Sequence, residues 1–165
     1  MHPVRESMNT ALKAVAVPRL RKLGFKGSFP HFRRLHVNHV DLAVFQFNKY
    51  GGSFVIEIAS LSQEQVDSHW SGSLSLGKAT VYDTNSRHRL GAVQGGDHWF
   101  VFGKQNDEPG HEIVEPPHVY ERIAAQAASL LEVDGELWWS SSNPSIERTS
   151  SSVLRTLPAA AHVKR

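Results

Sequence analysis

Histidine and aspartate at metal-ligand spacing are the first chemistry this sequence offers, because ten of its 165 residues are histidines. The closest group is His36, His39 and Asp41. On an extended strand residues 39 and 41 project to the same face, and residue 36 lies across a turn, so three ligands could converge. Asp67 and His69 form a pair too small for a tetrahedral site. Hairpin and surface histidines explain the same pattern, and we predict no metal site.

A second motif, GSLSLGKAT from Gly72 to Thr80, matches the phosphate-binding loop pattern GxxxxGK. Ala79 stands where a serine or threonine would hold magnesium, and no hydrophobic strand comes directly before the loop. We therefore predict a loop and a short strand here, and neither a nucleotide nor another cofactor.

Asp97 and His98 could form a catalytic dyad, since a carboxylate can orient a histidine that acts as a general base. Adjacent residues on a strand point to opposite faces, however, and Asp97 after two glycines suits a turn. The many serines lack the G-x-S-x-G elbow of a nucleophile. No catalytic residue is predicted, and whether the protein is an enzyme stays open.

A polar and aromatic cleft beside the sheet is the remaining candidate site. Gln46 carries this hypothesis, because it replaces an apolar residue on the strand face that holds Val40, Leu42 and Val44. A buried amide would need hydrogen-bond partners; alternatively, the strand simply reaches solvent at this residue. The residues predicted to bind a ligand or partner are Arg33, Gln46, Lys49, Tyr50, Arg89, Asp97 and Trp99.

Charge divides the chain unevenly, although the formal net charge is only +2. Residues 1–50 hold nine Lys or Arg against Glu6 and Asp41, which gives +7, and the remaining nine basic and fourteen acidic residues give −5. We expect packing of the two parts to neutralise this asymmetry. The later acidic part, with ten acidic residues between 97 and 147, favours a basic protein as partner.

Nucleic-acid binding is the other partner class that the charge suggests, since cations neutralise phosphates and exposed aromatic rings stack on bases. Phe25 follows a helix cap and Phe32 lies on a strand, so we predict both in the core and expect no nucleic-acid partner. The basic residues concerned are Arg19, Arg21, Lys22, Lys26, Arg33 and Arg34.

The elements that must position these residues begin with an amphipathic helix at residues 5–23, interrupted by Pro18 near residues 16–17 and closed by Gly24. Apolar side chains on both sides of the second strand that follows predict a central strand covered on both faces. Gly51 and Gly52 supply the turn after it. The three strands are predicted at residues 30–36, 39–49 and 53–61.

The later elements are less regular. Residues 62–85 are predicted to have little regular structure, and RHRLGAV and HWFVFG, around Gln94 to Asp97, predict a second hairpin. Pro116 and Pro117 open a helix that Asp134–Gly135 should end, and a short helix is expected from Pro144. The apolar face of the longer helix is predicted to be Val119, Ile123, Ala127 and Leu130.

Length and composition favour one α+β domain at residues 1–157, with a frayed tail at 158–165. Its mainly antiparallel sheet, a three-strand meander plus a hairpin, would be packed by the N-terminal helix and the helix after Pro116. The absence of cysteine excludes disulfides and thiol catalysis. Because no apolar run reaches membrane-spanning length and no signal sequence is visible, we expect a cytoplasmic protein that contacts no membrane.

Five segments of the chain, LRKLGFKG, PHFRR, FQFNKYGGSFVIEIA, RHRLG and GGDHWF, together resemble a bacterial family known as domain of unknown function 4304. The resemblance runs from about residue 5 to residue 130. It implies an α+β fold with a mainly antiparallel sheet, and it implies no established activity. Asn48 and Phe100 depart conservatively from the serine and tryptophan frequent in that family.

We therefore predict a non-catalytic binding or protein-interaction module. One alternative is an enzyme or small-ligand-binding domain that uses the polar and aromatic cleft. The other is nucleic-acid binding through the basic N-terminal part.

Overall fold

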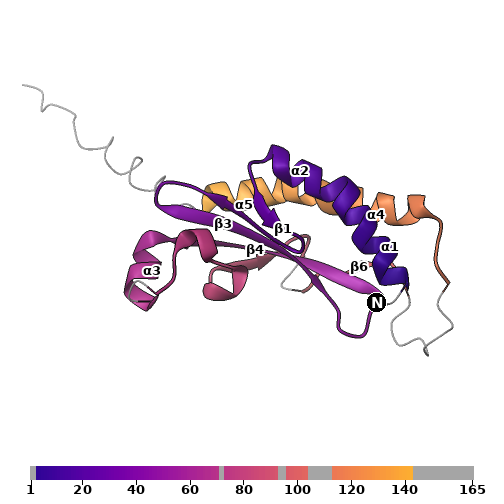
Figure 1. Cartoon of the computed structure of the whole chain (residues 1–165), viewed down its shortest axis with the longest axis horizontal. Coiled ribbons are helices and arrows are strands. Elements are labelled where there is room, and N and C mark those ends of the chain that lie inside the picture. Colours follow the sequence, from indigo (N-terminus) through magenta and orange to yellow (C-terminus); the bar gives the residue numbers. More distant parts are fainter. Residues whose placement is uncertain (1–2, 71–72, 93–95, 104–112, 143–165) are drawn as a thin grey trace, which may run out of the picture.

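The structure is a computed structural model and describes residues 3–70, 73–92, 96–103 and 113–142. A six-stranded antiparallel sheet carries four helices on one face, which we call the helix face (Figure 1). These helices are α1 (Pro3–Ala11), α2 (Val17–Lys22), α4 (Pro117–Leu130) and α5 (Glu136–Ser141). α3 (Gln63–Trp70) lies against the opposite, α3 face. The predicted α+β fold class is confirmed.

The sheet order is β1-β2-β3-β4-β5, and all neighbouring strands are antiparallel. The middle three strands confirm the predicted meander to within two residues at every boundary, whereas β1 is too short to show a sequence pattern. The strands are β1 (Lys26–Ser28), β2 (His31–Leu35), β3 (His39–Phe47), β4 (Ser53–Ser62), β5 (Arg87–Arg89) and β6 (Phe100–Val101).

The predicted second hairpin is wrong in its pairing. β5 pairs with residues 57–59 of β4, and β6 pairs with residues 53–54 of the same strand. Both are antiparallel to β4 and occupy the edge that β3 leaves open, so β6 continues the direction of β5 instead of returning beside it. β5 and β6 therefore form one interrupted edge strand beside β4, where a hairpin of two paired strands was expected.

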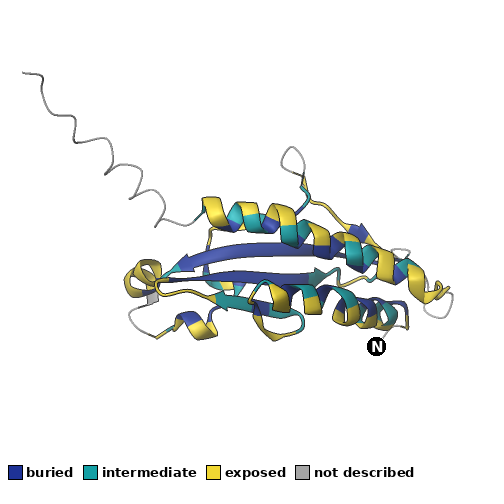
Figure 2. Ribbon diagram, turned by 90° about the horizontal axis from the view of Figure 1, so that it is seen from above, coloured by how far each residue is buried: buried dark blue, intermediate teal, exposed yellow. Residues whose placement is uncertain are grey.

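The central strands are buried on both faces, as the apolar residues on both sides of β3 predicted (Figure 2). On the helix face the core contains Phe45, Ile56 and Ile58. On the α3 face it contains Val40 and Leu42, covered by α3 and by the two 3₁₀ turns η2 (Leu76–Lys78) and η3 (Val81–Asp83). The α3 face is the smaller of the two cores.

A π-helical turn, η1 (Leu12–Ala16), joins α1 to α2 and provides the predicted interruption before Pro18. Proline has no N–H to bond the carbonyl four residues earlier, so the backbone widens there, and Val17 N–H donates to Leu12 O. Gly24 closes the helix with a φ of 89°, as predicted.

The helix after Pro116 begins as predicted but does not end at Asp134–Gly135. It continues through the π-helical turn η4 (Leu131–Gly135) into α5. Gly135 has a helical φ of −62° and serves close packing, because a Cβ atom there would lie 3.0 Å from the Trp139 ring. Three of the four residues predicted for the apolar face of the helix contact the core: Ala127 is buried, and Ile123 and Leu130 are partly buried. The fully buried residues are Tyr120, Ala124, Ala127, Ala128 and Leu131.

Residues 62–85 are more regular than predicted, because α3 and the two 3₁₀ turns lie within them. The short helix expected from Pro144 and the tail at 158–165 lie outside the described residues. Within the described part of the chain, no helix combines the length and the apolar character needed to cross a membrane.

Candidate functional site

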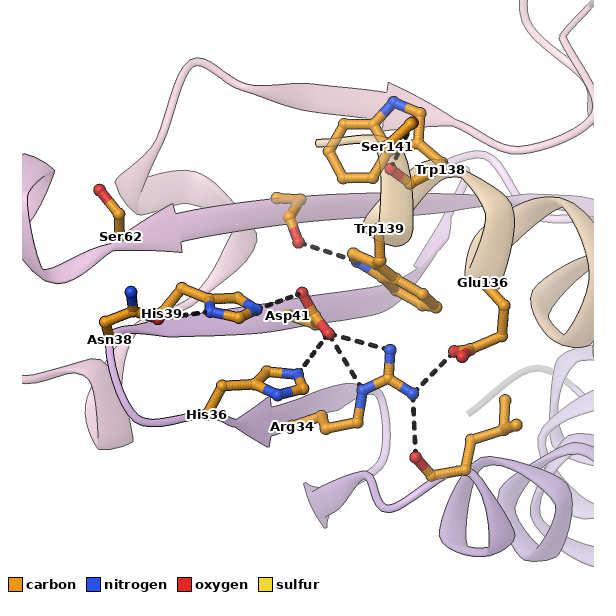
Figure 3. Close-up of polar contacts among 12 residues, drawn as sticks. Arg34, His36, Asn38, His39, Asp41, Ser62, Glu136, Trp138, Trp139 and Ser141 are labelled. Atoms are coloured by element: carbon orange, nitrogen blue, oxygen red, sulfur yellow. Dashed lines mark hydrogen bonds and ion pairs between the residues drawn. The ribbon is translucent and has the colours of Figure 1, made fainter. Parts of the chain in front are cut away.

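His36, His39 and Asp41 converge at one end of the helix face, where β2 ends and β3 begins (Figure 3). Their ligand-type atoms lie within 4.8 Å of one another. His39 and Asp41 share a face because they are two residues apart on β3. The His36 ring stacks on that of His39 with 4.1 Å between centroids. The convergence that the spacing allowed is present, but the interpretation as surface histidines is wrong for His39, which is only 5% exposed.

Arg34 fixes Asp41 from the neighbouring strand, directly opposite in the β2–β3 register. Its Nε and Nη2 atoms donate to Asp41 Oδ2 at 3.0 and 2.9 Å. Its Nη1 atom donates to Glu136 Oε1 at 2.8 Å and to Leu23 O at 3.0 Å. The guanidinium therefore joins the sheet to α5 and to the end of α2.

Aromatic rings enclose the same guanidinium. Its carbon lies 4.7 Å from the Phe25 ring centroid and 5.3 Å from that of Trp139. Trp139 donates its indole N–H to Ala59 O at 3.0 Å, which holds α5 on the sheet (Figure 3). With five hydrogen-bonding and stacking partners, the Arg34 side chain has little freedom to move away from Asp41.

The two carboxylate oxygens of Asp41 have different surroundings. Oδ2 accepts both Arg34 hydrogen bonds and lies 2.8 Å from His36 Nε2. Oδ1 is buried without a hydrogen-bond partner and lies 3.8 Å from His39 Nε2. Because this distance exceeds that of a hydrogen bond, a gap separates Oδ1 from the His39 ring.

Burial lowers the pKa of His39 below its usual value of 6.5, and the neighbouring His36 and Arg34 lower it further, while Asp41 raises it. Asn38 Oδ1 lies 3.0 Å from His39 Nδ1. The tautomer protonated at Nδ1 can donate to this oxygen and turns the Nε2 lone pair toward Asp41. A neutral imidazole in this orientation can bind a metal ion or accept a proton.

A polar hollow of about 300 Å³ adjoins the cluster beyond the end of α5. Ser60 and Ser62 line it and lie opposite Asp41 and His39 in the β3–β4 register, on the same face of the sheet. The other lining residues are Glu64, Gln65, Ser86 and Ser142. A second hollow of about 240 Å³ shares Gln65 and Ser86 and is also lined by Leu61, His69, Tyr82, Asp83, Thr84 and Asn85.

Two imidazoles and one carboxylate are ligands that suit a zinc ion. Among the described residues, His36, His39 and Asp41 are the one group of three or more side chains placed for metal binding. The same carboxylate can also orient the half-exposed His36 ring for proton transfer, because the bond to Oδ2 favours a proton on Nε2.

Four of the seven residues predicted to form a cleft make contacts in pairs. Arg89 forms an ion pair with Asp97. The Lys49 ammonium lies 4.6 Å from the Tyr50 ring centroid, on the turn after β3. None of the hydrogen bonds, ion pairs or ring contacts among the described residues joins one pair to the other.

The other three predicted residues also lie apart from the cluster. Arg33 donates to Gly77 O of η2, but its Nε is buried without a partner. Gln46 lies on the α3 face, as predicted, and is half-buried with Oε1 unpartnered, so it fits neither a fully satisfied amide nor a fully solvated one. Trp99 is 37% exposed. Neither described hollow is lined by any of the seven residues.

The phosphate-loop and dyad motifs have structural roles. Gly72 lies outside the described residues, and Leu76–Lys78 forms a 3₁₀ turn where part of a loop and short strand was predicted. His98 packs edge-on against Phe100 at 4.7 Å between ring centroids, while the carboxylate of Asp97 contacts Arg89. The expectation that Asp97 and His98 do not pair is confirmed.

The charge asymmetry is partly neutralised by packing between the two parts of the chain, as predicted. Arg19 Nε donates to Glu132 Oε1 at 2.8 Å, and Arg34 pairs with Glu136. Phe25 and Phe32 are 1% and 2% exposed, which confirms their prediction as core residues. These two rings are therefore not available for stacking on bases.

Sequence reasoning missed the hollow because it missed α3. Ser62 and Gln65 form a capping box: Ser62 N–H donates to Gln65 Oε1 at 2.8 Å, and Gln65 N–H donates to Ser62 Oγ at 3.2 Å. This S-x-x-Q spacing was a readable signal. The pairing of Arg34 with Glu136, 102 residues apart, left no local signal.

Comparison with known proteins bears on the family alone. The model of the family described as Domain of unknown function (DUF4304) matches residues 16–115, which include the whole sheet and exclude α4 and α5. No curated protein matches the chain, and neither does any solved structure. Because the match covers more than half of the sequence, this chain belongs to the DUF4304 family.

Proposed function

We propose that this protein is a binding domain that holds a small polar ligand in the serine-lined hollow beside Asp41 and His39. The hollow itself carries the proposal: its volume of about 300 Å³ reaches the lower end of the range of small-molecule sites. Ser60, at the wall nearest the cluster, is 7% exposed and so belongs to the sheet, not to a mobile rim.

The lining favours a ligand rich in hydroxyl or amine groups. Serine hydroxyls rotate and can donate or accept, and the Glu64 carboxylate accepts. Leu61 and Tyr82, in the adjoining hollow, would accept an apolar part of a longer ligand. Among the described residues that line the two hollows there is no lysine or arginine for an anionic ligand, and the nearby Arg34 is already bound to Asp41 and Glu136.

A fragment screen by NMR tests this proposal on the full chain, with a library of small polyols and amines. We expect ligands that shift the amide signals of Ser60 and Ser86. Ser86→Leu adds an apolar side chain at the exposed rim and should weaken these ligands about tenfold or more. Ser7→Leu, at a partly exposed serine of α1, which lies at the other end of the molecule, is the matched control.

Two results would contradict the proposal. One is equal binding to both leucine variants. The other is a set of ligands whose shifts map to Gln46, Arg89 and Trp99, which would favour the cleft predicted from the sequence instead.

Binding of a protein partner is the second candidate function, and with it we expect the protein to be cytoplasmic. Glu115, Glu121 and Asp134 are exposed on or beside the C-terminal helices, which leaves acidic side chains for a basic partner. Charge reversal of Glu115, together with Asp107, Glu108 and Glu112 from outside the described residues, should release such a partner in a pull-down. Retention of every captured protein would count against it.

A further inference from the structure

We infer that His36, His39 and Asp41 form a binding site for one Zn²⁺ ion. The site is distinct from the serine-lined hollow, and its existence does not depend on the organic ligand proposed above.

The spacing of the ligand atoms supports the inference. Four-coordinate zinc with bonds of about 2.0–2.2 Å separates its ligand atoms by about 3.3–3.6 Å. His39 Nε2 and Asp41 Oδ1 are 3.8 Å apart, and His36 Nε2 and Asp41 Oδ2 are 2.8 Å apart. The first distance is close to the required one, whereas the second involves the other oxygen of Asp41. The half-exposed His36 ring must therefore leave its stack on His39 and turn its Nε2 lone pair toward an ion held between Oδ1 and His39.

The environment of Asp41 Oδ1 is a second, independent observation in favour of a zinc site. Its residue is 2% exposed, and this oxygen accepts no hydrogen bond, which is costly for a buried carboxylate oxygen. It faces the edge of His39, where an ion would lie. Zinc would supply the missing partner while Arg34 keeps its two bonds to Oδ2, so the carboxylate would bridge the metal and the guanidinium.

The local charge permits a divalent ion despite the nearby arginine. Arg34 contributes one positive charge, whereas Asp41 and Glu136, both bonded to it, contribute two negative charges. The half-exposed His36 side chain leaves an approach from solvent and space for a water molecule as fourth ligand. Two imidazole nitrogens select zinc over magnesium or calcium, which prefer oxygen ligands.

Zinc titration of the tag-free full chain tests the site, after removal of metals with a chelator and in the absence of any organic ligand. At pH 7.5 calorimetry should show one equivalent of Zn²⁺. His36→Phe preserves the ring stack on His39 but removes the ligand nitrogen, and His39→Gln removes the second one. Each should weaken zinc binding at least about tenfold.

His118→Gln, at an exposed histidine near the start of α4, is the matched control and should bind zinc like the wild type. Co²⁺ provides a second readout, because its visible absorption reports nitrogen ligands and coordination number. The band seen with the wild type should be lost in His36→Phe and kept in His118→Gln. Circular dichroism establishes that each variant is folded.

The inference is overturned if the wild type takes up no stoichiometric zinc, or if His36→Phe and His118→Gln bind it equally. Either result leaves the proposed hollow untouched, since the fragment screen uses no metal. Conversely, a fragment screen that finds no ligand would leave the result of the zinc titration unchanged.

Discussion

Both hydrogen bonds that Arg34 donates to Asp41 end at the same carboxylate oxygen, Oδ2. The guanidinium thus neutralises the buried carboxylate, while Asp41 Oδ1 is left without a hydrogen-bond donor. The pair lies at the junction of three elements, since Arg34 also binds Glu136 of α5 and the Leu23 carbonyl oxygen. This arrangement makes Arg34 more important for the fold than its position on a short strand suggests.

Arg34→Ala should destabilise the protein by about 3–5 kcal/mol, because it leaves the Asp41 carboxylate buried without its counter-ion. Arg19→Ala is the matched control: it breaks an ion pair whose side chains are both about one-third exposed, and should cost about 0–1 kcal/mol. Urea unfolding measures both. Similar losses for the two variants would mean that Asp41 is not held as a buried charge.

Stability should fall as the pH drops below about 6.5, measured with a chelator present. The pKa of His39 is lowered in the folded state, first by burial and then by His36, so the unfolded chain binds the proton more readily. The stability contribution is complete above 6.5, the usual histidine value, and is lost as the pH falls toward and through the lower folded-state pKa.

His39→Gln should therefore flatten the curve of unfolding free energy against pH between 6.5 and the acid limit of folding. His118→Gln is exposed and should leave the curve unchanged. A wild-type curve that rises as the pH falls through this window would have the wrong sign.

Gln46→Met should be neutral or stabilising by up to about 1 kcal/mol, because it removes a buried amide oxygen that has no hydrogen-bond partner. Gln126→Met, on the exposed side of α4, controls for the change in composition and should lie within about 0.5 kcal/mol of the wild type. Thermal unfolding suffices for the comparison. A loss of more than 1 kcal/mol at Gln46 alone would indicate that its amide is bonded in solution.

Gly27→Ala should cost more stability than Gly51→Ala, although both glycines have positive φ, of 110° and 86°. A Cβ atom at Gly27 would lie 2.7 Å from the His31 carbonyl oxygen, whereas at Gly51 nothing lies within 4 Å. Gly51→Ala should lower the stability by about 1–2 kcal/mol, the cost of a positive φ for alanine. Gly27→Ala should lower it by more, because the new Cβ atom must also displace β2. Equal losses in chemical denaturation would remove the steric explanation.

The sequence predicted those parts of the fold whose signals are local. Alternating apolar residues located β3 and β4, and Pro18 and Gly24 located the interruption and the end of the first helix. The DUF4304 resemblance agreed with the same segments. Asp134–Gly135 led to a wrong prediction of a helix end. The glycine is needed there because it makes room for the Trp139 ring, and the sequence alone does not distinguish this packing role from a helix stop.

The candidate site was predictable only in part. The spacing of His36, His39 and Asp41 indicated their convergence, since strand and turn geometry bring them together. Their burial could not be read from it, because it depends on α5, whose Glu136 and Trp139 reach the cluster from a distant part of the chain. The seven residues predicted to form a cleft share a polar or aromatic character, and that character does not determine which side chains meet.

The interrupted edge of the sheet has a consequence for the behaviour of the protein at high concentration. An uninterrupted edge strand offers another chain a row of unpaired backbone groups on which to add. Here one edge consists of β5 and β6, of three and two residues, and the other of β1, of three residues that include Gly27. Within the described residues neither border presents a long template, so we expect this part of the sheet to resist growth by edge-to-edge aggregation.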